Sequence, residues 1–133
     1  MIIEACVDSV ESAVAAENGG AQRVELCATL LEGGLTPSAG AIALAREKLG
    51  IGLHVIIRPR GGDFLYTDDE HAAMARDIDA AKNAGADGVV IGVLDANAHV
   101  DEARTRELVE YTRSVTDAGT IGTLVRLAEA SDD

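Results

Sequence analysis

The sequence has little basic charge and no long apolar run. Its 133 residues include 11 lysines and arginines against 23 aspartates and glutamates, and the net charge of −12 argues against nucleic acid or an anionic membrane surface as a partner. No stretch approaches the roughly 18 apolar residues of a membrane span, and the first residues lack the basic and apolar regions of a signal peptide. We therefore expect a cytoplasmic protein that contacts neither nucleic acid nor membrane.

Cysteine is also scarce, because Cys6 and Cys27 are the only two. They stand far apart in the sequence, so a disulfide framework is not expected and reduced thiols are the default. The sequence contains no C-x-x-C motif and no methionine cluster. Its glycines lack the spacing of a P-loop or of a dinucleotide-binding motif, which disfavours nucleotide binding.

Short apolar segments alternate with amphipathic segments along most of the chain. We predict strands at residues 2–7, 22–27, 52–58 and 87–93. The helices between them are predicted to begin near Asp8-Ser9, at Thr36 as the cap before Pro37, and at a capping box over residues 67–70. Strands and helices that alternate in this way are typical of βαβ units with a parallel sheet. At 133 residues the chain suits one domain, but it has only about half of the roughly 250 residues of a complete (β/α)8 barrel.

Polar and apolar residues alternate along the first three predicted strands. Because side chains of a strand point to opposite faces with a period of two, one face carries a shared set: Glu4, Cys6 and Asp8, then Arg23, Glu25 and Cys27, then His54, Ile56 and Arg58. An open doubly wound sheet lies beneath helices on both faces, and its strands should be apolar throughout. The charged face instead favours a barrel lumen with ligand chemistry at the C-terminal ends of the strands. We predict an α/β fold of parallel βα units that forms part of a TIM barrel.

The segment His54–Tyr66, with the sequence HVIIRPRGGDFLY, leads from a predicted strand into a loop. Arg58 and Arg60 bracket the turn, and guanidinium groups suit phosphate or carboxylate. Gly61 and Gly62 let the backbone approach a ligand closely. This pattern predicts a loop that binds a small anionic ligand. The alternative is that the two arginines pair only with the chain's own acids.

Two thiols on neighbouring strands form a candidate metal site. Cu(I) prefers sulfur ligands, and Cys6 and Cys27 lie at matching depth on the first two predicted strands with inward-facing side chains. His54 is the candidate for a third ligand. The alternative is that the cysteines are small apolar core residues and that His54 is a core histidine.

A different hypothesis assigns the polar face to catalysis. Glu4, Glu25 and Asp63 would be general acids or bases. The anion would be bound by a second group of residues, namely Arg23, Arg58, Arg60, Gly61 and Gly62. If both groups converge near the top of the lumen, they suit a lyase or isomerase that acts on a small anionic substrate. The alternative is a salt-bridge network in which Arg23 and Arg58 neutralise the glutamates, so that no charge is buried unpaired.

Four segments of the chain resemble the CutC family: EACVDSVESA at the start, GGAQRVELCATLLEGGLTPSAG in the second unit, HVIIRPRGGDFLYTD in the third and GADGVVIGVLDANAHVD in the fourth. The arginine–glycine–aspartate block and the EGGLTPS segment are long and specific, and the resemblance covers residues 1 to about 109. It implies a single-domain (β/α)8 barrel. Because the family is described as copper-homeostasis proteins, it also implies copper homeostasis and copper ion binding in the cytoplasm.

The tail departs from this resemblance. Residues 110–133 resemble the extreme C-terminus of the family, so we predict a single partial-barrel domain over residues 1–133 with an internal deletion near residues 108–111. Half a barrel leaves strand edges with unpaired N–H and C=O groups. We therefore expect a homodimer or larger homo-oligomer, or a terminal helix over residues 117–130 that covers the open face. A further alternative is an inactive remnant that only self-associates.

Overall fold

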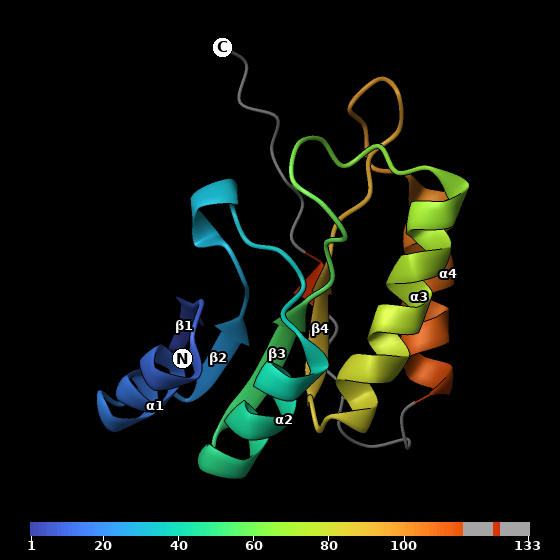
Figure 1. The fold of residues 1–133 in the computed structure, drawn as a ribbon. Helices are drawn as coiled ribbons and strands as arrows, with labels where there is room; N and C mark the ends of the chain where they lie inside the picture. Colours follow the sequence, from blue (N-terminus) through green and yellow to red (C-terminus); the bar gives the residue numbers. More distant parts are fainter. Residues whose placement is uncertain (116–123, 126–133) are drawn as a thin grey trace.

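The computed structural model describes residues 1–115 and 124–125. In this part of the chain, five parallel strands form one sheet in the order β1-β2-β3-β4-β5 (Figure 1). The strands are β1 (Glu4–Val7), β2 (Arg23–Leu26), β3 (Gly52–Ile56), β4 (Gly88–Ile91) and β5 (Leu124–Val125). The helices are α1 (Val10–Asn18), α2 (Ala39–Lys48), α3 (Asp68–Asn83) and α4 (Glu102–Ser114), with a short 3-10 helix η1 (Leu30–Glu32) after β2. All four predicted βα units are therefore present.

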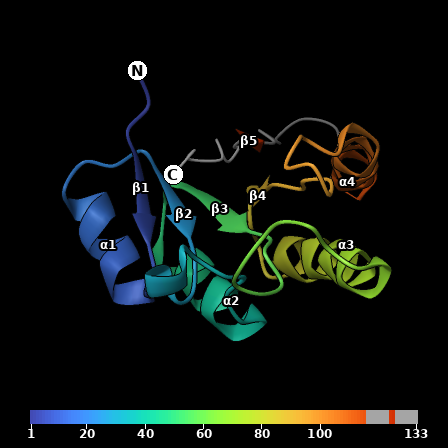
Figure 2. The ribbon, with the colours of Figure 1, turned by 90° about the horizontal axis from the view of Figure 1, so that it is seen from above.

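The helices lie on one side of a curved sheet (Figure 2). The apolar residues of the strands face these helices and form the core, which includes Val24, Leu26, Leu53, Val55, Ile42, Met74 and Ile78. Each fully buried aliphatic side chain of this kind contributes about 1.5–3 kcal/mol. Parallel strands in sequence order, with helices outside and a polar face inside, are the arrangement of a partial TIM barrel. The predicted fold class is confirmed.

The helix starts follow from short capping sequences. Thr67 and Glu70 form the predicted capping box at α3, and Ser9 caps α1 by accepting from the backbone N–H of Ser12. The predicted cap of α2 at Thr36 is wrong, because Ser38 takes that role. The hydroxyl of Thr36 is instead 2.8 Å from the backbone nitrogen of Arg58 and accepts its hydrogen bond, which ties the loop after β2 to the end of β3.

The C-terminal segment differs from the sequence prediction. Most of the helix expected at residues 117–130 lies outside the described residues, but Leu124 and Val125 form β5, which pairs with Val90 and Ile91 of β4. The helix prediction is therefore wrong at these two positions. The physical reason is that the edge of β4 offers unpaired backbone groups, which a further strand satisfies and a helix does not.

The opposite edge of the sheet is formed by β1. Within residues 1–115 and 124–125, β1 pairs with β2 alone, and the preceding Ile2 and Ile3 are 62% and 53% exposed. Self-association through this edge stays a prediction. None of the helices in the described ranges is both long and apolar enough to span a membrane.

Candidate functional site

The pairing of the strands places the predicted polar residues on one face of the sheet. Cys6 of β1 is paired with Glu25 of β2, and Glu25 is paired with His54 of β3, so the three residues lie side by side at one level. Glu4 and Arg23 are paired at the start of the same strands. The intervening residues Val24 and Val55 point to the helical side, where both are fully buried.

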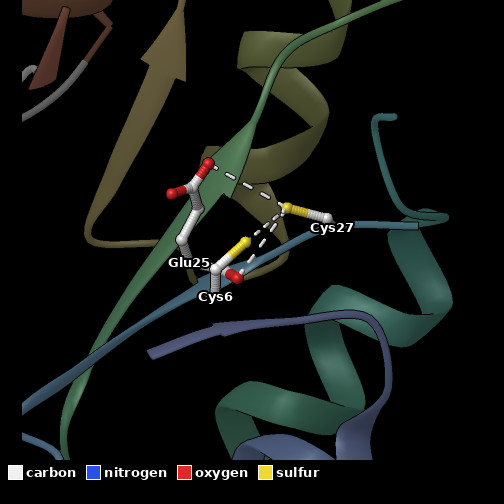
Figure 3. A group of neighbouring side chains, drawn as sticks. All are labelled: Cys6, Glu25 and Cys27. Atoms are coloured by element: carbon white, nitrogen blue, oxygen red, sulfur yellow. Dashed lines mark hydrogen bonds between the residues drawn. The ribbon is translucent and has the colours of Figure 1, made fainter. Parts of the chain in front are cut away.

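Cys6, Glu25 and Cys27 form what we call the thiol cluster (Figure 3). The two sulfurs are 3.7 Å apart, and Cys27 Sγ lies 4.0 Å from Glu25 Oε1. One ligand atom from each residue lies within 4.8 Å of the others. Cys27 is 2% exposed, whereas Cys6 is exposed. Two thiols at this spacing are a donor pair for a soft metal ion, and the carboxylate beside them is a hard donor.

The loop after β2 packs directly against the thiol cluster. Gly34 has a φ of +96°, and a Cβ at this position would lie 3.2 Å from both Cβ and Sγ of Cys27. Only glycine combines this backbone conformation with so close an approach. Close packing of Gly34 against Cys27 therefore restricts the position of the Cys27 side chain.

His54, the predicted third ligand, is not part of the thiol cluster. It is 5% exposed, and its Nδ1 is buried without a hydrogen-bond partner among the described residues. Burial and the positive charge of Arg23 lower the pKa of His54 from its usual value, so the imidazole is neutral at pH 7. The third residue of the thiol cluster is Glu25 and not His54. The position of Glu25 in β2, two residues before Cys27, is the signal that identifies it, because residues two apart in an extended chain point to the same side.

The acids predicted to be catalytic do not converge. Glu4, the first residue of β1, forms an ion pair with Arg23, with 2.5 Å between Oε2 and Nε. Asp63 lies in the loop after β3, where its side chain is 72% exposed. The two carboxylates are thus at opposite ends of the strands, and Glu25 lies between them. The expectation of convergence overlooked that Glu4 begins its strand, while ligand chemistry in barrels is at the C-terminal ends.

Arg58 joins the loops that follow β2 and β3. Its Nη1 donates to the backbone oxygens of Glu32 at 2.5 Å and Gly34 at 3.0 Å, and its Nη2 donates to the backbone oxygen of Gly62 at 2.9 Å. The guanidinium also lies over the ring of Phe64, 4.9 Å from the centroid. Arg58 is only 7% exposed, and it holds the two loops together as a clamp.

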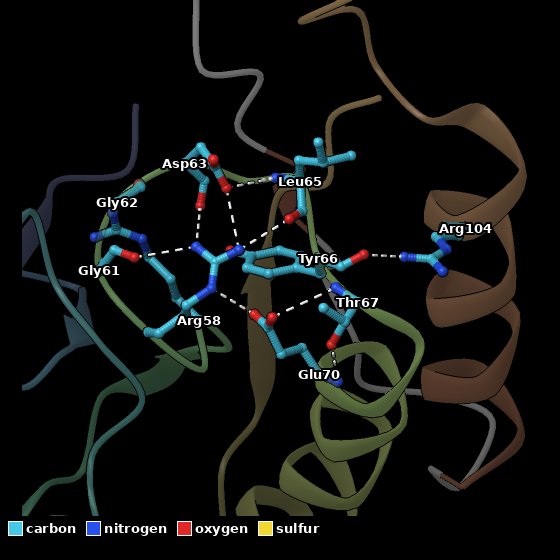
Figure 4. Close-up of polar contacts among 10 residues, drawn as sticks. Arg58, Gly61, Gly62, Asp63, Leu65, Tyr66, Thr67, Glu70 and Arg104 are labelled. Atoms are coloured by element: carbon cyan, nitrogen blue, oxygen red, sulfur yellow. Dashed lines mark hydrogen bonds and ion pairs between the residues drawn. The ribbon is translucent and has the colours of Figure 1, made fainter. Parts of the chain in front are cut away.

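Arg60 organises the loop after β3, and Figure 4 shows its partners Asp63, Leu65 and Glu70. Its Nε is 2.5 Å from Oε2 of Glu70, and its Nη2 donates to Asp63 Oδ1 at 3.1 Å and to the backbone oxygen of Leu65 at 2.8 Å. Its Nη1 donates to the backbone oxygens of Gly61 and Asp63. These contacts match the alternative in which the arginines bind the chain's own acceptors. Anion binding by Arg23, Arg58, Arg60, Gly61 and Gly62 stays a prediction.

A pocket of about 250 Å³ adjoins the thiol cluster at the C-terminal ends of the strands. Cys6, Glu25 and Arg58 contribute its polar lining, and Ile56, Phe64 and Val90 contribute apolar walls. This is the end of the sheet from which the loops after β2 and β3 project (Figure 1). Open parallel sheets and barrels place their ligands at this end.

Comparison with known proteins agrees with these features. The CutC family model matches residues 1–121. A CutC family protein of Chromobacterium violaceum is 59% identical over 107 residues, which are 80% of this chain and 43% of that protein. The copper homeostasis protein cutC homolog of Mus musculus is 53% identical over 112 residues, which are 84% of this chain and 41% of that protein. The chain thus spans less than half the length of these two relatives.

Solved structures show the same relationship. A crystal structure of CutC from Streptococcus agalactiae matches with a TM-score of 0.78 and 36% identity, covering 94% of this chain and 58% of that chain. A structure from Burkholderia cenocepacia, named as a phosphonomutase, matches with a TM-score of 0.63 at 15% identity, which shows a likeness in fold alone. The sequence motifs, the barrel-type sheet and these matches lead to one conclusion: the chain belongs to the CutC family.

Proposed function

We propose that this chain binds Cu(I) through Cys6 and Cys27 and acts in copper homeostasis. The observation that carries the proposal is the distance of 3.7 Å between the two sulfurs, one from β1 and the other from the residue directly after β2. Thiolates are the ligands that Cu(I) prefers. Cys6 is held in β1 by the sheet, and Cys27 is held by the hydrogen bond that its backbone N–H donates to the Val7 oxygen and by its contact with Gly34. Copper is cargo in this proposal, and the proposed compartment is the cytoplasm, where thiols stay reduced.

The names of two relatives support this function. The Mus musculus and Homo sapiens proteins, which are 53% and 51% identical to the chain over the matched residues, are both copper homeostasis protein cutC homologs. Glu25 would add negative charge beside the metal, while its hard oxygen is a poorer ligand for Cu(I) than sulfur. The two thiols therefore supply the affinity, and we assign His54 no direct role in binding.

The direct test is an anaerobic titration of Cu(I) against a competing chromophoric chelator. Wild-type protein is expected to bind one Cu(I), and Cys6→Ser/Cys27→Ser is expected to lose at least about a hundredfold in affinity, or about 2.7 kcal/mol. Glu4→Gln is the matched control, because it breaks an ion pair on the same face without touching a sulfur. Equal affinities of the wild type and the double variant would disprove thiolate binding.

Catalysis on a small anionic substrate is the second candidate, in the lyase or isomerase class. The observation in its favour is that Glu25 and Arg58 share one pocket at the C-terminal ends of the strands, where Glu25 would be the acid or base. Titration with phosphate and with acetate, followed by backbone amide shifts, should perturb Gly33 and Gly92 of the pocket lining. Unchanged shifts at both glycines would reject this candidate.

A further inference from the structure

The thiol cluster opens on one side to the pocket of about 250 Å³. Cys6 and Glu25 are part of its lining, whereas Cys27 is 2% exposed and lies behind them. A molecule in this pocket therefore approaches the sulfur pair from the side of Cys6. A molecule in the pocket could therefore contact the Cu(I) ion proposed above.

The spacing of the two sulfurs is compatible with a third ligand on the bound metal. Two metal–sulfur bonds of about 2.3 Å placed in line would separate the sulfurs by about 4.6 Å, but the sulfurs are 3.7 Å apart. If the sulfurs keep this spacing, an ion bound to both would lie off the line that joins them, which would leave part of its coordination sphere open. A third soft ligand entering through the pocket would complete it.

The pocket also has two opposite charges in its lining. Glu25 brings a carboxylate and Arg58 brings a guanidinium. The Nη atoms of Arg58 donate to backbone oxygens, but its Nε is buried without a hydrogen-bond partner within residues 1–115 and 124–125. A pocket of this size with one charge of each sign suits a small zwitterion better than a simple anion.

We propose that this pocket binds a small thiol amino acid, of the chemical class of cysteine, whose sulfur becomes the third ligand of Cu(I) held by Cys6 and Cys27. The carboxylate of the ligand pairs with Arg58, and its ammonium group pairs with Glu25. The thiol binds as a thiolate and releases its proton to solvent, and no electron is transferred. The inference rests on the proposed Cu(I) binding and extends it: copper enters or leaves this site by exchange with a small thiol.

Equilibrium dialysis of isotope-labelled thiols against the Cu(I)-loaded protein tests this inference. Three probes are matched: L-cysteine has both charges, 2-mercaptoethylamine lacks the carboxylate, and 3-mercaptopropionate lacks the ammonium group. We expect one L-cysteine per bound copper, with at least about tenfold weaker retention of each of the other probes and of L-cysteine by metal-free protein. Copper in the same samples is measured independently.

Variants that fill the pocket sharpen the test. Val90→Phe enlarges a lining residue on β4, two strands away from β2, which Cys27 follows. Ile56→Phe is a second such variant on β3. Both should bind Cu(I) as the wild type does and retain L-cysteine at least tenfold less. Equal retention of the three probes, undiminished retention by both variants, or copper binding without thiol retention would each overturn the inference while leaving the proposed function intact. Absence of bound copper in the wild type would overturn both.

Discussion

The arginine loop (residues 58–66) and the thiol cluster both concentrate polar chemistry, but they use it in opposite ways. In the loop, the guanidinium groups of Arg58 and Arg60 donate to the chain's own backbone oxygens and carboxylates. In the thiol cluster, the sulfurs of Cys6 and Cys27 lie 3.7 Å apart beside a pocket. Most guanidinium contacts of the loop are made with the chain's own acceptors, whereas the thiol cluster offers ligands for a metal ion.

The difference follows from the strength of the hydrogen bonds available to each group. A buried guanidinium is costly unless strong acceptors surround it, so the folded chain supplies carbonyl oxygens to Arg58. Thiols are weak donors and acceptors, and few protein groups compete with a metal for them. A charged sequence motif thus indicates a scaffold here, whereas two inconspicuous cysteines indicate the candidate binding site.

The largest expected effect on stability is at Arg58. Arg58→Lys keeps the charge, but an ammonium group cannot reach three backbone oxygens in two loops, and the free energy of unfolding should fall by about 2–3 kcal/mol. Urea unfolding measures this change. Arg60→Lys is the control in the exposed part of the same loop and should lose clearly less. Equal losses in the two variants would show that Arg58 is not the clamp.

Gly34→Ala connects the two regions and should disturb both stability and metal binding. A residue other than glycine at a φ of +96° costs about 1–2 kcal/mol, and the new Cβ would press on Cys27 at 3.2 Å. We expect severalfold weaker Cu(I) binding in the chelator competition. Gly20→Ala is the matched control, with a φ of +99° and no atom within 4 Å of its Cβ. If both variants bind Cu(I) equally well, contact with Cys27 is irrelevant to the site.

His54 makes the polar face sensitive to pH. Burial and Arg23 lower its pKa below the usual 6.5, so the unfolded chain takes up a proton before the folded chain does. The free energy of unfolding therefore has its full value above about pH 6.5 and falls as the pH drops toward the folded pKa, by about 1.4 kcal/mol for each unit of separation. His54→Asn should remove this part of the pH dependence in urea unfolding at about pH 7.5 and 5.5. The exposed-residue control His99→Asn should retain it, and the same slope in both variants would contradict the assignment.

The smallest effect is expected at Asp63, whose side chain is 72% exposed in its pair with Arg60. Asp63→Asn removes the charge but leaves Arg60 its contacts with Glu70 and with backbone oxygens. Because exposed ion pairs contribute little, thermal unfolding should be unchanged within error, and so should Cu(I) affinity. A marked loss of either would mean that the loop depends on this carboxylate.

Much of the fold could be predicted from short-range patterns. Alternation in the first three strands placed Cys6, Glu25 and Arg23 on one face, and the register confirms it. The Thr67 capping box was equally readable. The cap of α2 and strand β5 were not, because each depends on a contact distant in sequence: Thr36 bonds to Arg58, and Leu124 pairs with Val90. Local propensity does not encode such partners.

The candidate site could also be predicted only in part. Cys6 and Cys27 were identified from their matching depth on neighbouring strands, and they meet. His54 was expected beside them, but the third residue of the cluster is Glu25, which lies two residues before Cys27 at the end of β2. The carbonyl contacts of Arg58 were beyond sequence reasoning, since the loops that supply them have no regular periodicity.

X-ray absorption at the copper edge, on protein loaded with one equivalent of Cu(I) and free of added thiol, tests the central claim most directly. We predict two sulfur ligands per copper in the wild type and none in Cys6→Ser/Cys27→Ser. A copper environment of nitrogen and oxygen alone in the wild type, or one that the double variant leaves unchanged, would contradict it.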